Sequence, residues 1–576
     1  MKISTRLAAA TVVLALSAAG PVPAQTAAET LDRIFAEYFE DLLRFNPETA
    51  TRLGRTDHND RWSDPSPAGR SAWDTARREY LDRLQAVDAA GLSEQQKISR
   101  NLLLDSLRQG LEGAEASAYL TGFQQLFGYH TAVMVIMDAM PAVRVQDYED
   151  RVARLRGTPP YIDGVIETLR QGIAADIVQP KFVAQILARQ IQAQHEPGPD
   201  ETPLLKAFRD MPDAISPEDQ SRLREQAEAA YRQAFQPAWR KLHAFVAGEY
   251  ADNARTESPV TTLPKGPEIY ARLVKLYTTT DRTPAEIHQI GLDEVVRIQA
   301  EIDKIAKEEG FESGEAFEKH LRTTPEQRFS SKEEMLAYCR NLAMVVEPGL
   351  PDLFKTLPRM PVGIRPIPED REAASASNYN NPAVDGTRPG WFNLKAYKPE
   401  EQWKFDMHAL VLHETNPGHH LQIALQLEME GLPEFRKIYR ATAYTEGWAL
   451  YAERYGHQLG VYPDAAGRFS ALESERFRAK RLVVDTGIHH KGWTREQAIE
   501  YMGEEYTSEV ERYIAWPGQA LAYKMGQLMI VDLLERSRDR LGDEFDIREF
   551  HDVILRNGPL PLGLLEEQVE GWWAAR

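Results

Sequence analysis

Apolar residues recur three and four positions apart along most of the chain, the spacing that gathers them on one face of an α-helix. The pattern is clear over residues 27–45, where Leu31, Phe35 and Leu42 share a face. The same periodicity predicts helices over 70–90, 93–111, 147–174, 221–250 and 283–307. At the start of the last segment, Thr283 and Glu286 have the spacing of a capping box. We therefore expect a mostly helical protein.

One region has the pattern of β-strands instead. Three short segments lie between Pro358 and Tyr397, bounded by proline, glycine and asparagine; they are residues 362–367, 375–379 and 391–396. They predict a small antiparallel sheet. Two other stretches, 195–203 and 253–267, are rich in proline and glycine and read as loops. The second suggests a soft boundary between a helical scaffold, 25–265, and a catalytic part, 266–576, within one continuous fold.

The first 24 residues have the features of a bacterial secretory signal. Lys2 and Arg6 form a basic start, an apolar run extends from Leu7 to Gly20, and small residues follow where a peptidase would cut. The apolar run is short for a membrane span. No cysteine follows it, so we expect no lipid anchor. The sequence therefore predicts a periplasmic or secreted protein.

Composition narrows the class of partner. The 576 residues include 87 acidic and 68 basic side chains, a net charge of −19, and removal of Lys2 and Arg6 with the signal leaves 66 against 87, or −21. So anionic a surface argues against nucleic acid or anionic lipid as a partner. Cys339 is the single cysteine, which excludes an internal disulfide. Its place in a helical pattern over 333–345 indicates a buried thiol.

The candidate chemistry begins at His413 and Glu414, which Pro417, Gly418, His419 and His420 follow. Neutral imidazole is a good zinc ligand, and a glutamate beside it can take a proton from zinc-bound water. Zinc peptidases usually place their two histidines four residues apart on a helix. Here the interval from His413 to His419 is six residues.

This interval does not suit a regular helix. Six residues turn a helix by about 600°, so the two side chains would point apart; seven, reaching His420, restore the face but add a rise of about 10.5 Å. Pro417 removes a backbone donor and Gly418 tolerates unusual angles. We therefore predict that the helix breaks there and returns a second histidine to His413. His408, one turn earlier, is interpreted as structural.

A second helical segment supplies carboxylates. Glu446 is the natural third ligand, and Glu453, two turns further on nearly the same face, is placed to orient a ligand histidine by hydrogen bonding. Trp448 and Tyr451 between them read as core residues.

These motifs together resemble the bacterial domain-of-unknown-function 885 family. The matching residues are His-Glu-x-x-Pro-Gly-His-His from His413, Glu-Gly-Trp-Ala-x-Tyr-x-Glu from Glu446, Arg-Leu-Val-Val-Asp-Thr-Gly-Ile-His from Arg481, and Pro-Gly-Gln-Ala-Leu-Ala-Tyr-Lys-Met-Gly from Pro517. The family is grouped with gluzincin metallopeptidases, relatives of angiotensin-converting enzyme and thermostable carboxypeptidases. The resemblance implies a helical clam around a central cleft, with the small sheet beside the zinc helix.

The resemblance also implies one zinc ion per chain on His413, a second histidine and Glu446, with Glu414 as the base. In the family the Pro-Gly-His part is fixed and the next position is sometimes tyrosine, which favours His419 over His420 and leaves His420 as an alternative ligand.

Residues around this centre suggest a substrate shell. Tyr523, or a histidine at 489 or 490, is a candidate donor to the oxyanion. Arg481 or Lys524 is a candidate for holding a substrate carboxylate, although Arg481 has the spacing to pair with Asp485 on a helix. Asn393 lies on a strand that we expect at the sheet edge, where an extended peptide would pair.

The expected function is therefore zinc-dependent hydrolysis of peptides, as a carboxypeptidase or dipeptidase. A zinc amidase acting on small amides or acylated amino acids would use the same chemistry, and an inactive helical binding protein is the third hypothesis.

Overall fold

The computed structural model describes residues 26–576 apart from 373–375, 385 and 387. The predicted signal peptide lies outside the described residues. The described chain is mostly helical, as its apolar periodicity predicts, with one small sheet among the helices. None of the described helices combines the length and the hydrophobicity that crossing a bilayer requires.

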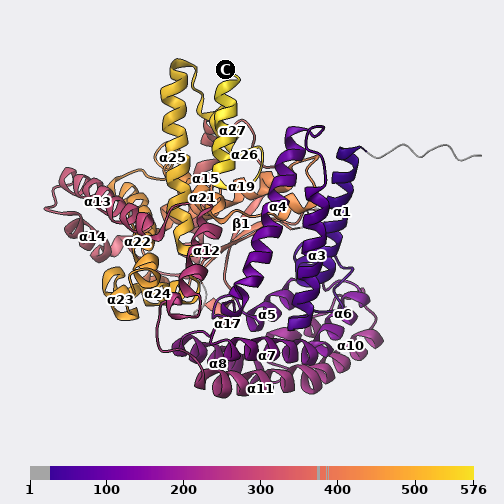
Figure 1. Ribbon diagram of the computed structural model, residues 1–576. Helices are drawn as coiled ribbons and strands as arrows, with labels where there is room; N and C mark the ends of the chain where they lie inside the picture. Colours follow the sequence, from indigo (N-terminus) through magenta and orange to yellow (C-terminus); the bar gives the residue numbers. More distant parts are fainter. Residues whose placement is uncertain (1–25, 373–375, 385, 387) are drawn as a thin grey trace, which may run out of the picture.

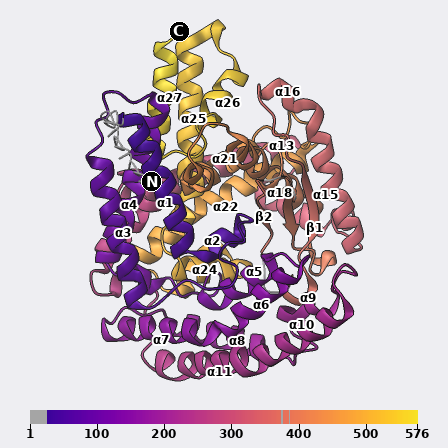
Figure 2. The same cartoon turned by 90° about the vertical axis from the view of Figure 1, so that its right-hand side faces the viewer.

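Three long helices near the N-terminus lie side by side (Figures 1 and 2). They are α1 (Ala27–Phe45), α3 (Pro67–Gln85) and α4 (Glu94–Glu115), with the short α2 (Pro47–Arg52) directly after α1. Thr26 and Ser93 begin α1 and α4 with capping boxes, which satisfy amides that a first helical turn leaves without partners. The hydrophobic core of this layer includes Phe435 from the C-terminal half, so the layer packs on the rest of the molecule.

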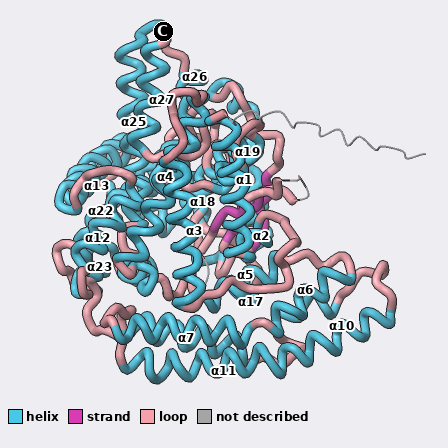
Figure 3. Tube along the Cα trace, turned by 45° about the vertical axis from the view of Figure 1, so that its right-hand side comes forward, coloured by secondary structure: helices cyan, strands magenta, loops and turns pink. Residues whose placement is uncertain are grey.

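Seven further helices build a second layer with its own core. They are α5 (Tyr129–Ala139), α6 (Val145–Arg156), α7 (Thr158–Ala174), α8 (Lys181–His195), α9 (Lys206–Arg209), α10 (Pro217–Ala230) and α11 (Gln236–Phe245). Figure 3 shows α7, α10 and α11 along one edge of the molecule. The predicted helix 147–174 breaks at Gly157, because Pro159 and Pro160 follow and lack the amide hydrogens that would continue its hydrogen bonds. The predicted helix 221–250 continues from α10 through α11 by way of two π-turns.

The remaining helices form the C-terminal half of the chain, which carries the candidate site. They are α12 (Gly266–Thr278), α13 (Pro284–Glu308), α14 (Gly314–Thr323), α15 (Lys332–Val346), α16 (Leu350–Leu353), α17 (Glu369–Glu372), α18 (Lys404–Glu414), α19 (His419–Glu428), α20 (Glu434–Ile438), α21 (Thr442–Glu453), α22 (Ala465–His489), α23 (Arg495–Met502), α24 (Thr507–Ala515), α25 (Ala522–Leu541), α26 (Ile547–Leu555) and α27 (Leu562–Ala574). Thr283 forms the predicted capping box with Glu286 at the start of α13. Cys339 on α15 is fully buried, and burial raises the pKa of its thiol to about 12.

The small sheet contains three strands in the order β1-β3-β2. β2 (Asn378–Asn380) is antiparallel to β3 (Gly390–Leu394), but β1 (Val362–Pro366) is parallel to β3. The prediction of an antiparallel sheet is therefore wrong for one pair, since the long connection from β1 to β3 permits a crossover that a tight hairpin does not. β3 is also the central strand, so the expected edge strand at 391–394 is paired on both sides.

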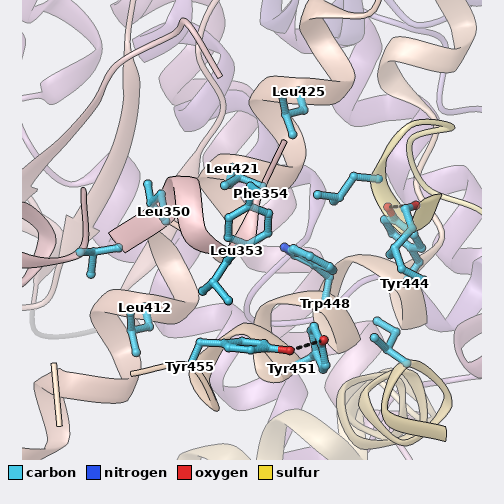
Figure 4. Packing of buried hydrophobic residues seen from close by; sticks show 14 of the residues in the cluster. Leu350, Leu353, Phe354, Leu412, Leu421, Leu425, Tyr444, Trp448, Tyr451 and Tyr455 are labelled. Carbon is cyan, nitrogen blue, oxygen red and sulfur yellow. Dashed lines mark hydrogen bonds between the residues drawn. The ribbon is translucent and has the colours of Figure 1, made fainter. Parts of the chain in front are cut away.

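The largest core cluster includes residues of α18, α19 and α21, the helices that carry the candidate site (Figure 4). Trp448 and Tyr451 of α21 are completely buried in it, as predicted. The Trp448 ring lies 6.1 Å from that of Phe354, which follows α16. The indole of Trp448 also donates a hydrogen bond to the carbonyl of Pro417 at 2.9 Å, so the core holds the connection between α18 and α19 in place.

Candidate metal centre

The connection between α18 and α19 accounts for the unusual histidine spacing. The Thr415 amide makes the last regular helical bond, to the Val411 carbonyl, and the Gly418 amide then turns back to the Leu412 carbonyl at 3.0 Å. A side chain at Gly418 would lie well inside van der Waals contact of the Leu412 and His413 carbonyl oxygens, so only glycine fits this approach. The Asn416–Pro417 peptide bond is cis. The helix breaks where the sequence predicts.

The break brings His419 back to His413 and towards Glu446 on α21. One ligand atom from each of the three residues lies within 4.8 Å of the other two. The Nε2 atoms of His419 and His413 are 3.3 Å and 3.7 Å from Glu446 Oε2. The two imidazole rings are 4.7 Å apart and nearly perpendicular. The end of α18, the start of α19 and one face of α21 thus meet in one small volume.

This donor set fits a zinc ion. Tetrahedral zinc with bonds of about 2.0–2.1 Å separates its ligand atoms by about 3.3 Å, close to the two distances to Glu446. Glu446 Oε2 is buried without a properly oriented hydrogen bond among the described residues, although both histidines are near it. A buried polar atom without a partner is costly, and a cation between these atoms would remove that cost.

Charge around His413 favours a cation as well. Its Nδ1 lies 2.8 Å from Glu453 Oε1, the orienting contact that the sequence predicts. Burial acts to lower the pKa of His413, but the Glu446 and Glu453 carboxylates outweigh burial and raise that pKa to about 9. Burial would raise the pKa of Glu446, yet the two histidines hold it well below its ordinary value. The site therefore stabilises positive charge between its ligands.

Two further predicted residues lie beside this triad. Glu414 is the last residue of α18 and is 8% exposed, and its carboxylate makes no hydrogen bond to any described residue. Burial raises the pKa of the Tyr379 phenol, and the nearby Glu414 carboxylate adds to that rise. The Tyr523 ring lies 6.2 Å from the His413 ring and nearly parallel to it, and the Arg481 guanidinium lies 4.6 Å from the centre of the Tyr523 ring. Glu414 and Tyr523 are thus both placed at the centre.

Two of the predicted histidines are fully engaged elsewhere. The ring nitrogens of His420 contact the Tyr379 hydroxyl at 2.8 Å and the Met360 carbonyl at 2.9 Å, so neither is left for a metal. His489 accepts from the Val260 amide and donates to the Tyr513 carbonyl. The prediction of a catalytic His489 is therefore not supported, because backbone groups occupy both nitrogens. His490 is exposed.

Lys524 was expected to bind substrate, and the structure corrects this. Its ammonium is completely buried and contacts Glu475 at 2.5 Å, Gln527 at 2.6 Å and Glu294 at 2.8 Å. Three partners use all three of its hydrogens. Lys524 therefore links α13, α22 and α25 rather than a ligand.

Asn393 and the Arg481–Asp485 pair are corrected in the same way. The Asn393 amide accepts from Arg365 Nε at 2.7 Å and donates to Asn378 at 3.0 Å, within the sheet. Arg481 contacts Glu509 and the Tyr513 hydroxyl instead of Asp485. Its Nη1 is buried without a hydrogen-bond partner among the described residues, so the role of Arg481 in holding a substrate carboxylate stays a prediction.

The sequence reasoning missed Tyr379. This residue lies on β2, and its ring is 6.5 Å from the ring of His419 while its hydroxyl contacts His420. It comes from a predicted strand, 34 residues before His413, and no spacing relates the two segments. The tertiary fold alone brings them together.

Comparison with known proteins gives the chain a family. A crystal structure of a candidate lipoprotein from Colwellia psychrerythraea is 29% identical, with a TM-score of 0.91 over 96% of this chain and 100% of that one. A candidate lipoprotein of unknown function from Shewanella oneidensis has the same fold, with 18% identity and a TM-score of 0.72 over 94% and 99% of the two chains. No curated protein matches in sequence. Residues 47–569 match the family model described as "Bacterial protein of unknown function (DUF885)", and the chain therefore belongs to that family.

Proposed function

We propose that this protein is a zinc-dependent hydrolase of the gluzincin type that cleaves peptide bonds. The observation that carries the proposal is the convergence of His413, His419 and Glu446, with Glu453 orienting His413 from behind. Two histidines and a glutamate, with an acidic residue next to the first histidine, are the donor set of such hydrolases.

Each residue around the triad has a separate role in the proposed hydrolysis. Bound zinc would supply the Lewis acidity that acidifies a water molecule. The Glu414 carboxylate, which has no hydrogen bond to a described residue, accepts a proton and then delivers it to the leaving nitrogen. Tyr523, whose ring faces His413, donates its phenolic hydrogen to the developing oxyanion.

Export is part of the proposal. The basic start and apolar run of residues 1–24 are typical of a secretory signal. The similar Colwellia protein is described as a candidate lipoprotein, which agrees with a location outside the cytoplasm. We infer that the protein acts in the periplasm or beyond the cell.

Metal content tests the proposal first. Mature wild-type protein should contain about one zinc per chain by mass spectrometry, and His413→Ala should lose it because one of three protein ligands is gone. His320→Ala, an exposed histidine on α14, is the matched control and should keep its zinc. Wild-type protein that takes up no zinc when zinc is supplied would contradict the proposal. A peptide library with zinc-loaded protein then tests for hydrolysis.

A further inference from the structure

Positive charge lies next to the metal centre although the chain is strongly acidic. Arg440 is on the turn between α20 and α21, six residues before Glu446, and its side chain is exposed. Its Nη2 is 3.4 Å from Oδ1 of Asn381, the residue that follows β2. Arg440 therefore joins the start of the helix that carries Glu446 to the end of the strand that carries Tyr379.

Because Tyr379 on this strand lies beside the triad, the contact with Asn381 places Arg440 near the triad as well. Tyr379 stacks near His419 and contacts His420, as described above. The electrostatic neighbours of Arg440 agree with the geometry. The protein around the guanidinium lowers the pKa of Arg440, whereas Glu446 and Tyr379 act to raise it. The side chain as a whole is exposed, and its guanidinium is within electrostatic reach of Glu446, one of the three residues of the triad.

A second arginine approaches from the N-terminal layer. Arg52, the last residue of α2, is exposed, and its charge acts to lower the pKa of Arg440. Figures 2 and 3 both draw α2 beside the sheet. Within the described part of the chain, no carboxylate lies within 4.0 Å of either guanidinium. The two like charges repel each other, and a ligand carboxylate between them would offset that repulsion.

We propose that Arg440, assisted by Arg52, binds a carboxylate of the substrate while the triad holds the scissile bond. The planar guanidinium fork matches a carboxylate and binds it with two parallel hydrogen bonds. The substrates would be peptides or acylated amino acids that carry a free carboxylate close to the cleaved bond. This inference rests on the proposed function and specifies its substrate class.

The test compares matched peptides with zinc-loaded protein. One peptide ends in a free carboxylate, the second in a carboxamide, and the third in a carboxamide with glutamate as its last residue. We expect wild-type kcat/KM to be about 10–100-fold higher for a carboxylate than for the plain carboxamide, the range of a charged hydrogen bond. The third peptide shows whether the C-terminal or a side-chain carboxylate is bound.

Arg440→Ala should remove this preference by lowering kcat/KM for the carboxylate peptide alone, and Arg440→Lys should restore part of it. Arg232→Ala, an exposed arginine on the outer layer, is the control and should retain the preference. A structural defect would slow all peptides equally. Equal cleavage of carboxylate and carboxamide by wild type, or an unchanged preference in Arg440→Ala, would overturn the inference.

Binding separates failure of this inference from failure of the proposed function. Glu414→Gln protein should bind the carboxylate peptide without cleaving it, and the Glu414→Gln/Arg440→Ala protein should bind it about 10–100-fold more weakly. If zinc-loaded wild type cleaves nothing but this binding difference is found, hydrolysis fails and the carboxylate site stands. If neither turnover nor a difference in binding is found, the carboxylate site fails too.

Discussion

At the scale of single residues, hydrogen bonds determine which histidines can bind a metal. His413 uses Nδ1 on Glu453 and leaves Nε2 facing Glu446. His420 and His489 use both nitrogens on neighbouring groups, and each is held neutral by burial, which lowers their pKa values to about 4 and about 3. A neutral, fully bonded imidazole stabilises the fold but has no lone pair left for zinc.

Glu414 gives the sharpest prediction at this scale. Glu414→Gln should keep about one zinc per chain, because the residue is not among the ligands, and should lower turnover about 10²–10⁴-fold, the usual contribution of a general base. The measurement pairs metal content with kcat on one substrate. Zinc retained together with wild-type turnover would show that another group takes the proton.

The sequence motifs predicted the triad of His413, His419 and Glu446, and only the family resemblance favoured His419 over His420. Pro417 and Gly418 revealed the break, because their chemistry is local. The choice between His419 and His420 depends on Tyr379 and Met360, which come from other segments and satisfy His420. The expected Arg481–Asp485 pair failed for the same reason: Asp485 instead accepts from Tyr270 and Gly518. Helical spacing shows which residues can meet, not which partners compete for them.

At the scale of helices, the ligand helix α21 packs directly on α25 through glycines. An added side chain at Gly447 would collide with the backbone of Gly526, and one at Gly526 would collide with the Ala443 carbonyl. Glu446 precedes Gly447 on α21, and Tyr523 lies one turn before Gly526 on α25. Backbone-to-backbone packing therefore fixes Glu446, a proposed metal ligand, and Tyr523 relative to each other.

Gly526→Ala should separate these helices. We expect a loss of about 1–3 kcal/mol in unfolding free energy, typical of an overpacked core, together with weaker zinc binding because Glu446 moves. Gly571→Ala on α27 is the control, since an added methyl there meets nothing within 4 Å and alanine favours a helix. Denaturant unfolding and zinc titration measure both effects. Equal behaviour of the two variants would contradict this account of the packing.

Helices were predicted better than the sheet. The segment 27–45 matches α1 at both ends, because its amphipathic pattern and its cap agree. The direction of β1 relative to β3 and the strand order depend on the path of the long connection between them. Alternating side chains carry no information about that path, so the sequence did not predict it.

At the scale of the whole molecule, buried neutral histidines occur in separate cores. His130, His489 and His551 are fully buried in different regions, and burial lowers their pKa values to about 4, about 3 and about 4. Their folded-state pKa values lie below the ordinary 6.5. Each therefore contributes stability that is complete above pH 6.5 and is lost as the pH falls towards 4. Asp485, which is completely buried and has a pKa raised by burial to about 7, acts in the opposite sense.

His551→Gln isolates one of these contributions. His551 contacts the Leu353 carbonyl and the Tyr451 hydroxyl, so the variant should be less stable at pH 8. Its unfolding free energy should nevertheless fall less steeply below pH 6.5, by about 1.4 kcal/mol per pH unit near pH 5, the value for one proton. Ile554→Val in the same core is the control: it lowers stability without changing the slope. Identical slopes for all three proteins would refute the assignment of His551.

The four residues between Glu414 and His419 have a consequence for recognising distant relatives. They increase the number of residues between His413 and His419, yet the chain folds back there. The three candidate ligand atoms therefore stay close together. A search that requires the familiar four-residue interval would discard this chain. A search for three atoms within 4.8 Å of one another would retain it. For such sites, the arrangement of the ligand atoms in space identifies a relative better than the interval between the ligands in the sequence does.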